Sequence, residues 1–212
     1  MKGSSSTALL LAALAVAASS ACGGGMRSAA ELQELAARNR QPHSPADTRF
    51  MTAMIPHHAQ AVLFAGWAES HRASRAVRVF GERMVVAQSD EIVTMRSWLS
   101  ERGEPVPSGE FARHAARTGA EPASMMPGML TEQQLAELDA ARGAEFDRLF
   151  LTYMIPHHEG ALSMVDDLFE SFGGAQNDFV FKLASDIYAD QETEIERMHV
   201  LLDAFPRLDP IQ

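Results

Sequence analysis

The chain has very little cysteine and few basic residues. Only one of its 212 residues is cysteine, which excludes an internal disulfide and a metal site built from a pair of thiolates. Lysine and arginine number 18 against 28 aspartates and glutamates, which gives a formal net charge of -10 at pH 7. Because nucleic-acid binding depends on clustered basic side chains, this balance argues against a nucleic-acid partner and suits cations better.

Long apolar runs are also scarce, and the clearest one is at the N-terminus. It covers residues 8–18, follows Lys2 and precedes the small residues 19–21, a pattern typical of a secretory signal peptide over residues 1–21. The run is shorter than the roughly 20 residues that a membrane-spanning helix needs. Cys22 comes next, and this order resembles a bacterial lipoprotein signal. We therefore expect an extracytoplasmic protein anchored to the cell membrane by a lipid on Cys22; an ordinary signal peptide is the alternative.

After the cysteine, the sequence indicates a tether followed by a single helical domain. Residues 22–46 combine glycines, a short helical stretch and two prolines, so we interpret them as a tether with a leading helix. Apolar residues then recur at helical spacing through residues 47–205, and no strand-like alternation competes with them. This spacing predicts two helical hairpins, in residues 47–102 and 144–205, with the first turn near residues 70–73.

A linker rich in small residues, residues 103–143, joins the two hairpins. Within it, the apolar sequence MMPGM at residues 125–129 is suited to packing on the domain. Thr131 followed by Gln134 indicates the start of a short capped helix, because such a pair satisfies free backbone amides at a helix N-terminus. We therefore expect one short helix, in residues 131–141, before the second hairpin.

The second hairpin repeats the first in sequence. At a constant offset of 100, the matching pairs are Asp47/Asp147, Phe50/Phe150, Thr52/Thr152, Met54/Met154, Ile55/Ile155, Pro56/Pro156, His57/His157, His58/His158 and Ala61/Ala161. At an offset of 103, they are Gln88/Gln191, Glu91/Glu194, Ile92/Ile195, Met95/Met198 and Leu99/Leu202. Two hairpins with one apolar face each bury those faces most simply against each other. We therefore predict an all-α fold, a four-helix bundle with pseudo-two-fold symmetry.

Both histidine pairs are predicted to face the interior of this bundle. At about 100° per residue, Met54, His57 and His58 lie on the same helix face as the apolar residues. Met54 precedes the two histidines by three and four positions, so its sulfur can lie beside either ring. The same spacing recurs in the second copy, with Met154, His157 and His158.

Two glutamates are predicted to lie on otherwise apolar helix faces. Glu91 and Glu194 occupy the middle of these faces in the second helix of each hairpin. The polar and sulfur-bearing residues around them are the repeated pairs Gln88/Gln191 and Met95/Met198. A buried carboxylate costs several kcal/mol unless it is paired or coordinated. We therefore expect the facing histidines, or a metal that they share, to neutralise both glutamates.

Pro56 and Pro156 directly precede the two histidine pairs. Inside a helix, proline removes one backbone hydrogen bond and clashes with the preceding turn, so we expect a kink immediately before each pair. The alternative interpretation is that each proline begins a helix and that the histidines occupy its first turn.

The repeated polar residues favour a buried metal site. A single buried histidine is usually a hydrogen-bonded core residue, and a methionine stripe is usually packing. Here each copy of the repeat places histidines, methionines and a carboxylate on buried helix faces, so the same set of potential ligands occurs twice. The predicted ligands are His57, His58, His157, His158, Met54, Met154, Met95, Met198, Glu91 and Glu194, the glutamates as direct ligands or as partners of the histidines. The histidines outside this pattern, which we expect to be solvated or incidental, are His43, His71, His114 and His199.

The kind of ligand indicates which metal to expect. Di-iron sites in helical bundles use glutamates and Glu-x-x-His pairs, whereas here the position three before His57 and His157 is methionine. Imidazole together with thioether sulfur favours copper, above all Cu(I). Zinc bound through histidine and glutamate, with the methionines as packing, remains an alternative, and iron is left open.

These motifs resemble the bacterial family called domain of unknown function 305. Its Phe-x-x-x-Met-Ile-x-His-His-x-x-Ala pattern occurs at residues 50–61 and 150–161, and its Gln-x-x-Glu-Ile-x-x-Met pattern at residues 88–95 and 191–198. The sequence MMPGML before the second copy is similar to the family's lead-in. The resemblance covers residues 47–204 and implies a ferritin-like fold, a secreted or lipid-anchored location and, for some members, copper binding or resistance.

Three functions are compatible with these features. We expect a non-catalytic, extracytoplasmic lipoprotein that binds copper for storage, buffering or resistance. The first alternative is a metal-dependent oxidase of ferritin-like type that uses copper or iron with O2, although the chain shows no nucleophile or substrate-pocket pattern. The second is a metal-free structural or partner-binding bundle, whose polar core fixes the register of the helices.

Overall fold

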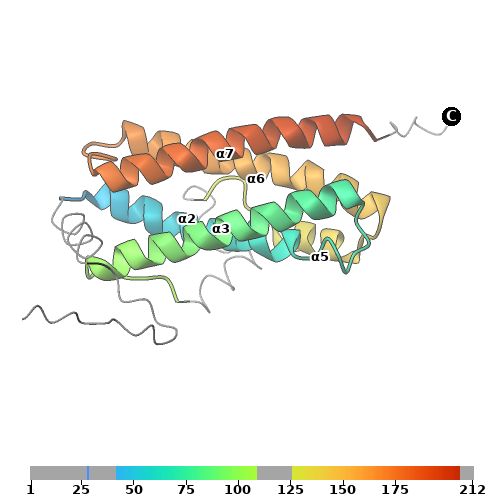
Figure 1. The fold of residues 1–212 in the computed structure, drawn as a ribbon, viewed down its shortest axis with the longest axis horizontal. Helices are drawn as coiled ribbons and strands as arrows, with labels where there is room; N and C mark the ends of the chain where they lie inside the picture. Colours follow the sequence, from blue (N-terminus) through green and yellow to red (C-terminus); the bar gives the residue numbers. More distant parts are fainter. Residues whose placement is uncertain (1–27, 29–41, 109–125, 206–212) are drawn as a thin grey trace, which may run out of the picture.

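All regular structure in the described part of the protein is helical. The computed structural model describes residues 28, 42–108 and 126–205. Its helices, in chain order, are α2 (Pro45–Ala65), α3 (Arg75–Glu101), α5 (Glu132–Ala140), α6 (Ala144–Glu170) and α7 (Asp178–Asp203) (Figure 1). The predicted all-α class is confirmed for these residues. The expected signal peptide, residues 1–21, and Cys22 lie outside them.

The four long helices form two hairpins that pack against each other. α2 packs along α3, α6 packs along α7, and the hairpins meet where α2 contacts α6 (Figure 1). The short helix α5 contacts both α2 and α6. α2 with α3 and α6 with α7 thus form two hairpins, and the contact between α2 and α6 brings the repeated motifs together. The ferritin-like version of the four-helix bundle stays a prediction.

Two apolar cores hold the hairpins together, and both hairpins contribute to each. Core A includes Phe64 of α2, Phe80 of α3, Phe150 of α6 and Met198 of α7. Core B includes Phe50 of α2, Met95 of α3, Met164 of α6 and Ile187 of α7. Along the chain, α2 passes from core B into core A, whereas α6 passes from core A into core B. The histidine pairs at 57–58 and 157–158 lie at these two passages.

Two buried aspartates at equivalent positions tie each hairpin to the turn of the other. Asp47, at the start of α2, accepts the amide of Ala175 in the α6–α7 turn, with an N–O distance of 2.7 Å. Asp147, at the start of α6, accepts the amide of Ser74 before α3, with both oxygens at 3.1 Å. Hydrogen bonds to an ionised carboxylate are stronger than neutral ones. These reciprocal ties fix α2 relative to α6, and with them the histidines.

Capping residues in the sequence account for several helix starts. Ser44 and Asp47 form a capping box at α2, and Thr131 and Gln134 form the predicted one at α5. Asn177 accepts two backbone amides at the start of α7. Each of these side chains satisfies amides that the first helical turn leaves without a partner.

Pro56 and Pro156 lie inside α2 and α6 rather than at their starts. The alternative in which each proline begins a helix is therefore wrong. The histidines that follow belong to the middle of each helix, where side chains point into the contact between hairpins. The kink expected at each proline stays a prediction.

His71 is part of the structural framework, which corrects the expectation that it is solvated. Its side chain is 5% exposed, and its Nδ1 lies 3.0 Å from the carbonyl oxygen of Trp67. Its Nε2 lies 2.9 Å from the carbonyl oxygen of Asp139, so the ring joins α5 to the turn after α2. That turn also begins earlier than predicted, because α2 ends at Ala65 instead of continuing to Ser70.

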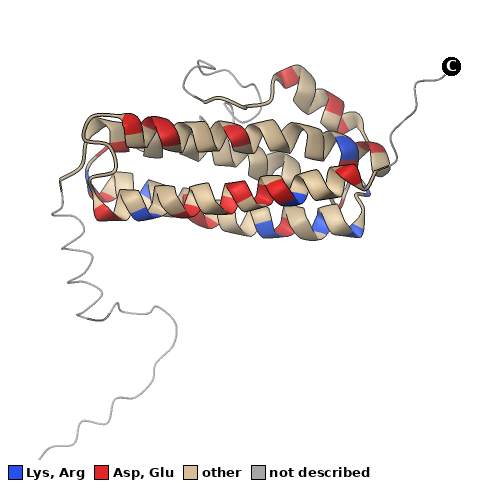
Figure 2. Cartoon of the chain, turned by 90° about the horizontal axis from the view of Figure 1, so that it is seen from above, with Lys and Arg blue, Asp and Glu red and all other residues tan. Residues whose placement is uncertain are grey.

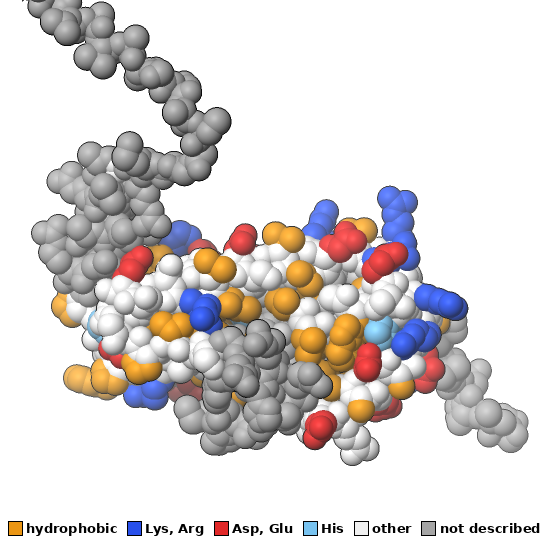
Figure 3. Space-filling model, turned by 90° about the horizontal axis from the view of Figure 1, so that it is seen from below, with side chains coloured by type: hydrophobic (Ala, Val, Ile, Leu, Met, Phe, Trp, Pro, Cys, Tyr) orange, Lys and Arg blue, Asp and Glu red, His pale blue; other side chains and the backbone are white. Residues whose placement is uncertain are grey.

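The surface of the described helices is mixed in charge. Acidic residues occur along the length of the long helices, with basic residues more scattered between them (Figure 2). Apolar side chains lie between charged ones on the face seen in Figure 3. None of the described helices is long and apolar enough to cross a membrane.

Candidate metal centre

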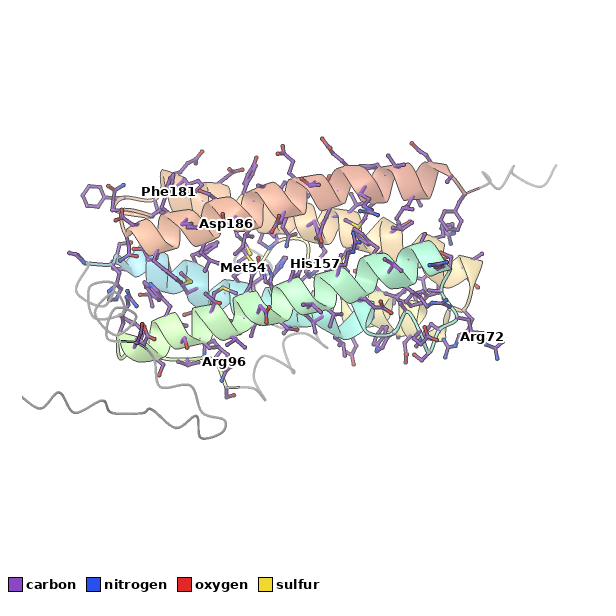
Figure 4. All side chains as sticks on the ribbon, in the orientation of Figure 1. Met54, Arg72, Arg96, His157, Phe181 and Asp186 are labelled. Atoms are coloured by element: carbon purple, nitrogen blue, oxygen red, sulfur yellow. The ribbon has the colours of Figure 1, made fainter. Side chains whose placement is uncertain are left out.

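The four repeated histidines meet in the interior, where α2 contacts α6. The rings of His57 and His157 face each other with centroids 4.0 Å apart and planes inclined by 40°. His58 and His158 flank them, with centroids 6.3 Å and 6.2 Å from their neighbours in sequence. All four side chains are 0% exposed. His157 lies near the middle of the long axis of the molecule, as does Met54 (Figure 4). The structure therefore unites the histidines of both copies in one cluster.

Each predicted glutamate lies against a histidine of its own hairpin. Nε2 of His58 is 2.7 Å from a carboxylate oxygen of Glu91, and Nε2 of His158 is 2.7 Å from one of Glu194. The second contact is aligned as a hydrogen bond, whereas the first has the distance without that alignment. The glutamate side chains are 16% and 22% exposed, so these pairs connect the buried rings to the edge of the core. The predicted pairing of glutamate with histidine is present twice.

Nε2 of His57, His58 and His158 lies close to an acceptor oxygen, while Nδ1 of each ring has no hydrogen-bond partner within the described residues. Nε2 of His57 lies 3.0 Å from the carbonyl oxygen of Pro127 and must donate, because a carbonyl only accepts. Within the described residues, Nδ1 of His57, His58 and His158 has no hydrogen-bond partner, and His157 has none at either nitrogen. A buried polar atom without a partner costs roughly 1–3 kcal/mol. A nitrogen lone pair in this state is suited to binding a metal.

Burial also keeps the rings of His57, His157 and His158 uncharged. It lowers the pKa of His57 to about 3, and the neighbouring His58 adds to the effect. Burial lowers the pKa of His157 well below its ordinary value, and repulsion from His57 acts in the same direction. The pKa of His158 is also lowered by burial, although Glu194 partly opposes the shift. These three imidazoles are therefore neutral near pH 7, so a metal ion need not displace a proton from them.

The four predicted methionines are buried on either side of the histidines. Met54 and Met95 belong to core B, whereas Met154 and Met198 belong to core A, and all four are 0% exposed. Among the described residues, no three His, Cys, Asp or Glu side chains are arranged to hold a metal ion. Nitrogen and oxygen side chains alone are thus not arranged as a complete site among these residues, and the methionine sulfurs as ligands stay a prediction.

Two buried glutamines add polar atoms to the helix faces that carry the glutamates. Gln88 and Gln191 are each 3% exposed and occupy equivalent positions of the repeat. Both amide atoms of Gln88 and the amide oxygen of Gln191 lack hydrogen-bond partners within the described residues. The sequence identifies this pair as part of the repeated polar set, but it does not show that their amides are left unsatisfied.

Sequence reasoning missed one residue beside the cluster, Gln60. Its amide forms hydrogen bonds with both backbone groups of Leu130, in the segment before α5. The available signal was a break in the repeat, because the equivalent position in the second copy is Gly160. The predicted packing of the apolar linker sequence is confirmed for its described part, since Met126 is 3% exposed.

The histidines outside the repeat have other environments. Nε2 of His43 lies 2.9 Å from a carboxylate oxygen of Glu104, and the side chain is partly buried. His199 is exposed, as expected, and His114 lies outside the described residues.

Within the described residues, the fold and the site define an all-helical protein in which two histidine-bearing hairpins enclose a cluster of four buried imidazoles. The sequence profile of the family described as Domain of unknown function (DUF305) matches residues 47–202. The chain belongs to this family, as its motifs predict. Among curated proteins, none is detectably similar to it.

Several solved structures resemble the chain. A DUF305 fragment from Deinococcus radiodurans is 27% identical, with 78% of this chain and 100% of that chain covered and a TM-score of 0.63. A DUF305 protein from Streptomyces coelicolor, presumed to be secreted, is 26% identical, with 74% and 91% covered and a TM-score of 0.63. CopM in its Cu(II)-bound form is 28% identical, with 74% and 95% covered and a TM-score of 0.59. CopM has also been solved in a Cu(I)-bound form.

Proposed function

We propose that this protein is an extracytoplasmic lipoprotein that binds copper, for storage, buffering or resistance, and is held at the membrane by a lipid on Cys22. The observation that carries the proposal is the cluster of four buried histidines, each with at least one ring nitrogen lacking a partner. The similarity to CopM, a protein solved with Cu(I) and with Cu(II), supports copper. The Streptomyces relative supports a location outside the cytoplasm.

The residues divide into two roles in this proposal. Nδ1 of His57, His58 and His158 and either nitrogen of His157 bind the metal, together with thioether sulfurs from Met54, Met154, Met95 and Met198. Glu194 accepts the Nε2–H of His158 and Glu91 lies against Nε2 of His58, so the Nδ1 atoms of both rings stay available, as carboxylates ensure for ligating histidines generally. Imidazole and thioether are the donors that favour Cu(I). Lewis-acid or redox chemistry is not required of a protein that only holds the ion.

The metal-free structural bundle is the less favourable alternative on physical grounds. A polar core that only fixes helix register is stable when its groups satisfy one another, and a partly satisfied network is worse than an apolar core. Here Nδ1 of His57, His58 and His158 and both nitrogens of His157 lack hydrogen-bond partners among the described residues, so the network is only partly satisfied. The two-hairpin arrangement, in which each core draws on all four long helices, supports the ferritin-like bundle that we propose for the fold.

Metal analysis of the purified protein tests the proposal. Protein from a copper-supplemented periplasm should contain copper, and replacing His57 and His157 together by alanine should abolish the binding. The matched control is His199→Ala, which changes an exposed histidine and should leave the copper content unchanged. Zinc or iron in place of copper would correct the metal. A metal-free wild-type protein, with a copper affinity that the double substitution does not alter, would overturn the proposal.

Thermal unfolding separates the metal-binding from the structural function. A ligand that binds only the folded state at 100 times its dissociation constant stabilises by about 2.7 kcal/mol. The wild-type protein should therefore unfold at a higher temperature when Cu(I) is present, whereas the double histidine variant should not respond. Full stability without metal and no response to Cu(I) would favour the structural bundle.

A further inference from the structure

The segment 126–130, which we call the strap, lies directly on helix α6 beside the histidine cluster. A Cβ atom on Gly160 would lie 1.9 Å from the carbonyl oxygen of Pro127, and one on Gly128 would lie 2.3 Å from that of Pro156. Side chains at both positions are thus excluded by the backbone of the other segment. Met126 and Leu130, at the two ends of the strap, are 3% and 2% exposed. The strap is therefore a packed part of the domain, in contact with the turn of α6 that carries His157.

Gln60 fastens the far end of the strap to helix α2. Its Nε2 donates to the carbonyl oxygen of Leu130 at 3.0 Å, and its Oε1 accepts the amide of Leu130 at 2.7 Å. The side chain is 0% exposed, so water does not compete for these bonds. Two bonds from one planar amide to one residue fix both the position and the orientation of the strap backbone.

The strap in turn determines which ring nitrogen of His57 carries the hydrogen. Pro127, three positions before Leu130, presents its carbonyl oxygen to Nε2 of His57 at 3.0 Å. Since a carbonyl is only an acceptor, this contact requires the hydrogen on Nε2 and leaves the lone pair on Nδ1. Nδ1 is the nitrogen that has no partner within the described residues. The strap thus favours the same tautomer of His57, with the hydrogen on Nε2, that the carboxylate of Glu194 favours in His158.

We infer that Gln60 is a positioning residue that acts through the strap: it holds the Pro127 carbonyl so that His57 keeps its hydrogen on Nε2 and presents Nδ1 to the metal. The tautomer is a property of the metal-free protein, whereas its use in metal binding rests on the proposed function. No counterpart exists in the second copy, because Gly160 replaces Gln60 and the strap passes over α6 at that point. His57 is consequently the oriented ring of the facing pair, whereas neither nitrogen of His157 has a hydrogen-bond partner in the part of the chain that the structure describes.

Nitrogen chemical shifts of the imidazoles in the metal-free, full-length protein test the tautomer directly. In the wild type, His57 should be a single tautomer with the hydrogen on Nε2. In Gln60→Leu, which keeps the approximate volume but removes both hydrogen bonds, His57 should become a mixture of tautomers. Hydrogen exchange at the Leu130 amide should become at least tenfold faster. Gln133→Ala, a change at an exposed glutamine near the strap, is the matched control and should behave as the wild type.

Competition with a Cu(I) chelator then tests the role of this tautomer in binding. The affinity for Cu(I) should fall by about 10- to 100-fold in Gln60→Leu, the range that loss of a ligand's hydrogen-bond partner generally produces, and should not change in Gln133→Ala. A wild-type His57 with its hydrogen on Nδ1 would overturn the inference even if the variant does not fold. An unchanged tautomer and unchanged Leu130 exchange in a folded variant would overturn it as well. The expected tautomers without any Cu(I) binding would uphold the control of His57 by Gln60 and overturn the copper function.

Discussion

The two hairpins carry the same chemical groups but hold them differently. In the second hairpin, Glu194 forms an aligned hydrogen bond with His158, whereas the Glu91–His58 contact in the first has the same 2.7 Å distance without alignment. In the first hairpin the strap orients His57, whereas His157 in the second has no hydrogen-bond partner among the described residues. A repeat supplies the ligands twice, and a single linker can serve only one copy. The site is therefore asymmetric although the sequence that builds it is nearly symmetric.

Acid should unfold the protein, and this is the largest effect we expect. The unfolded chain takes up protons below pH 6.5, whereas buried His57 resists protonation until about pH 3. Stability is then fully present above pH 6.5 and decreases as the pH falls from 6.5 toward 3. Each such histidine contributes a slope of up to about 1.4 kcal/mol per pH unit.

Single histidine replacements show how much each hairpin contributes to this pH dependence of stability. Urea unfolding of the metal-free protein at several pH values should give a flatter pH dependence for His57→Leu and for His157→Leu than for the wild type. The change at His157 should flatten the curve as well, because burial and repulsion from His57 lower its pKa well below the ordinary value. A pH-independent stability of the wild type between pH 4 and about 6.5 would contradict the neutral, buried state of these rings.

The reciprocal aspartates should differ in the stability that they provide. Asp47 accepts two backbone amides, from Ser44 at 2.8 Å and from Ala175 at 2.7 Å, whereas Asp147 accepts one from Ser74 between hairpins. Since a hydrogen bond to a charged group is worth about 1.5–3 kcal/mol, Asp47→Ala should cost about 3–5 kcal/mol of unfolding free energy and Asp147→Ala about 2–3 kcal/mol.

Chemical denaturation measures both changes, with Asp166→Ala at an exposed position as the control. That control should stay within about 0.5 kcal/mol of the wild type. A larger loss at Asp147 than at Asp47 would show that the hydrogen bond between Asp47 and Ser44 in the capping box contributes little to the free energy of unfolding.

A methyl group at Gly160 tests the contact that only the second hairpin makes with the strap. Its Cβ would lie 1.9 Å from the Pro127 carbonyl oxygen, so the strap must shift. We expect Gly160→Ala to cost about 1–3 kcal/mol, the usual range for overpacking. Gly66→Ala is the control, because its Cβ would approach only its own helix end, at 3.2 Å. Equal stability of the two variants in thermal unfolding would place the strap elsewhere in solution.

The smallest expected effect concerns the two glutamates. Glu194→Gln should lower the affinity for Cu(I) by about tenfold, because the amide no longer holds the Nε2–H of His158 as strongly. Glu91→Gln should lower it less, since the contact with His58 is not aligned as a hydrogen bond. Chelator competition with both purified variants decides the order. A larger loss of affinity for Glu91→Gln would contradict the inference that Glu194 holds its histidine more strongly than Glu91 does.

Local pattern predicted the hairpins and the pairing of histidine with glutamate, because helical periodicity fixes which side chains share a face. It did not predict His71 or Gln60. Both make their decisive contacts with residues about 70 positions away, His71 with Asp139 and Gln60 with Leu130. Such contacts depend on where the linker returns to the domain, which periodicity does not specify. The alignment of each Glu–His contact and the tautomers likewise follow from packing between helices.

The passage of α2 and α6 through both cores has a consequence for folding. A single hairpin would hold one part of core A and one part of core B, and both parts would lie open to water together with its own two histidines. Neither half of the chain is thus an independent folding unit, and each is the partner that the other needs for burial. The two hairpins associate as two subunits of a dimer would, but because they belong to one chain their association does not depend on protein concentration.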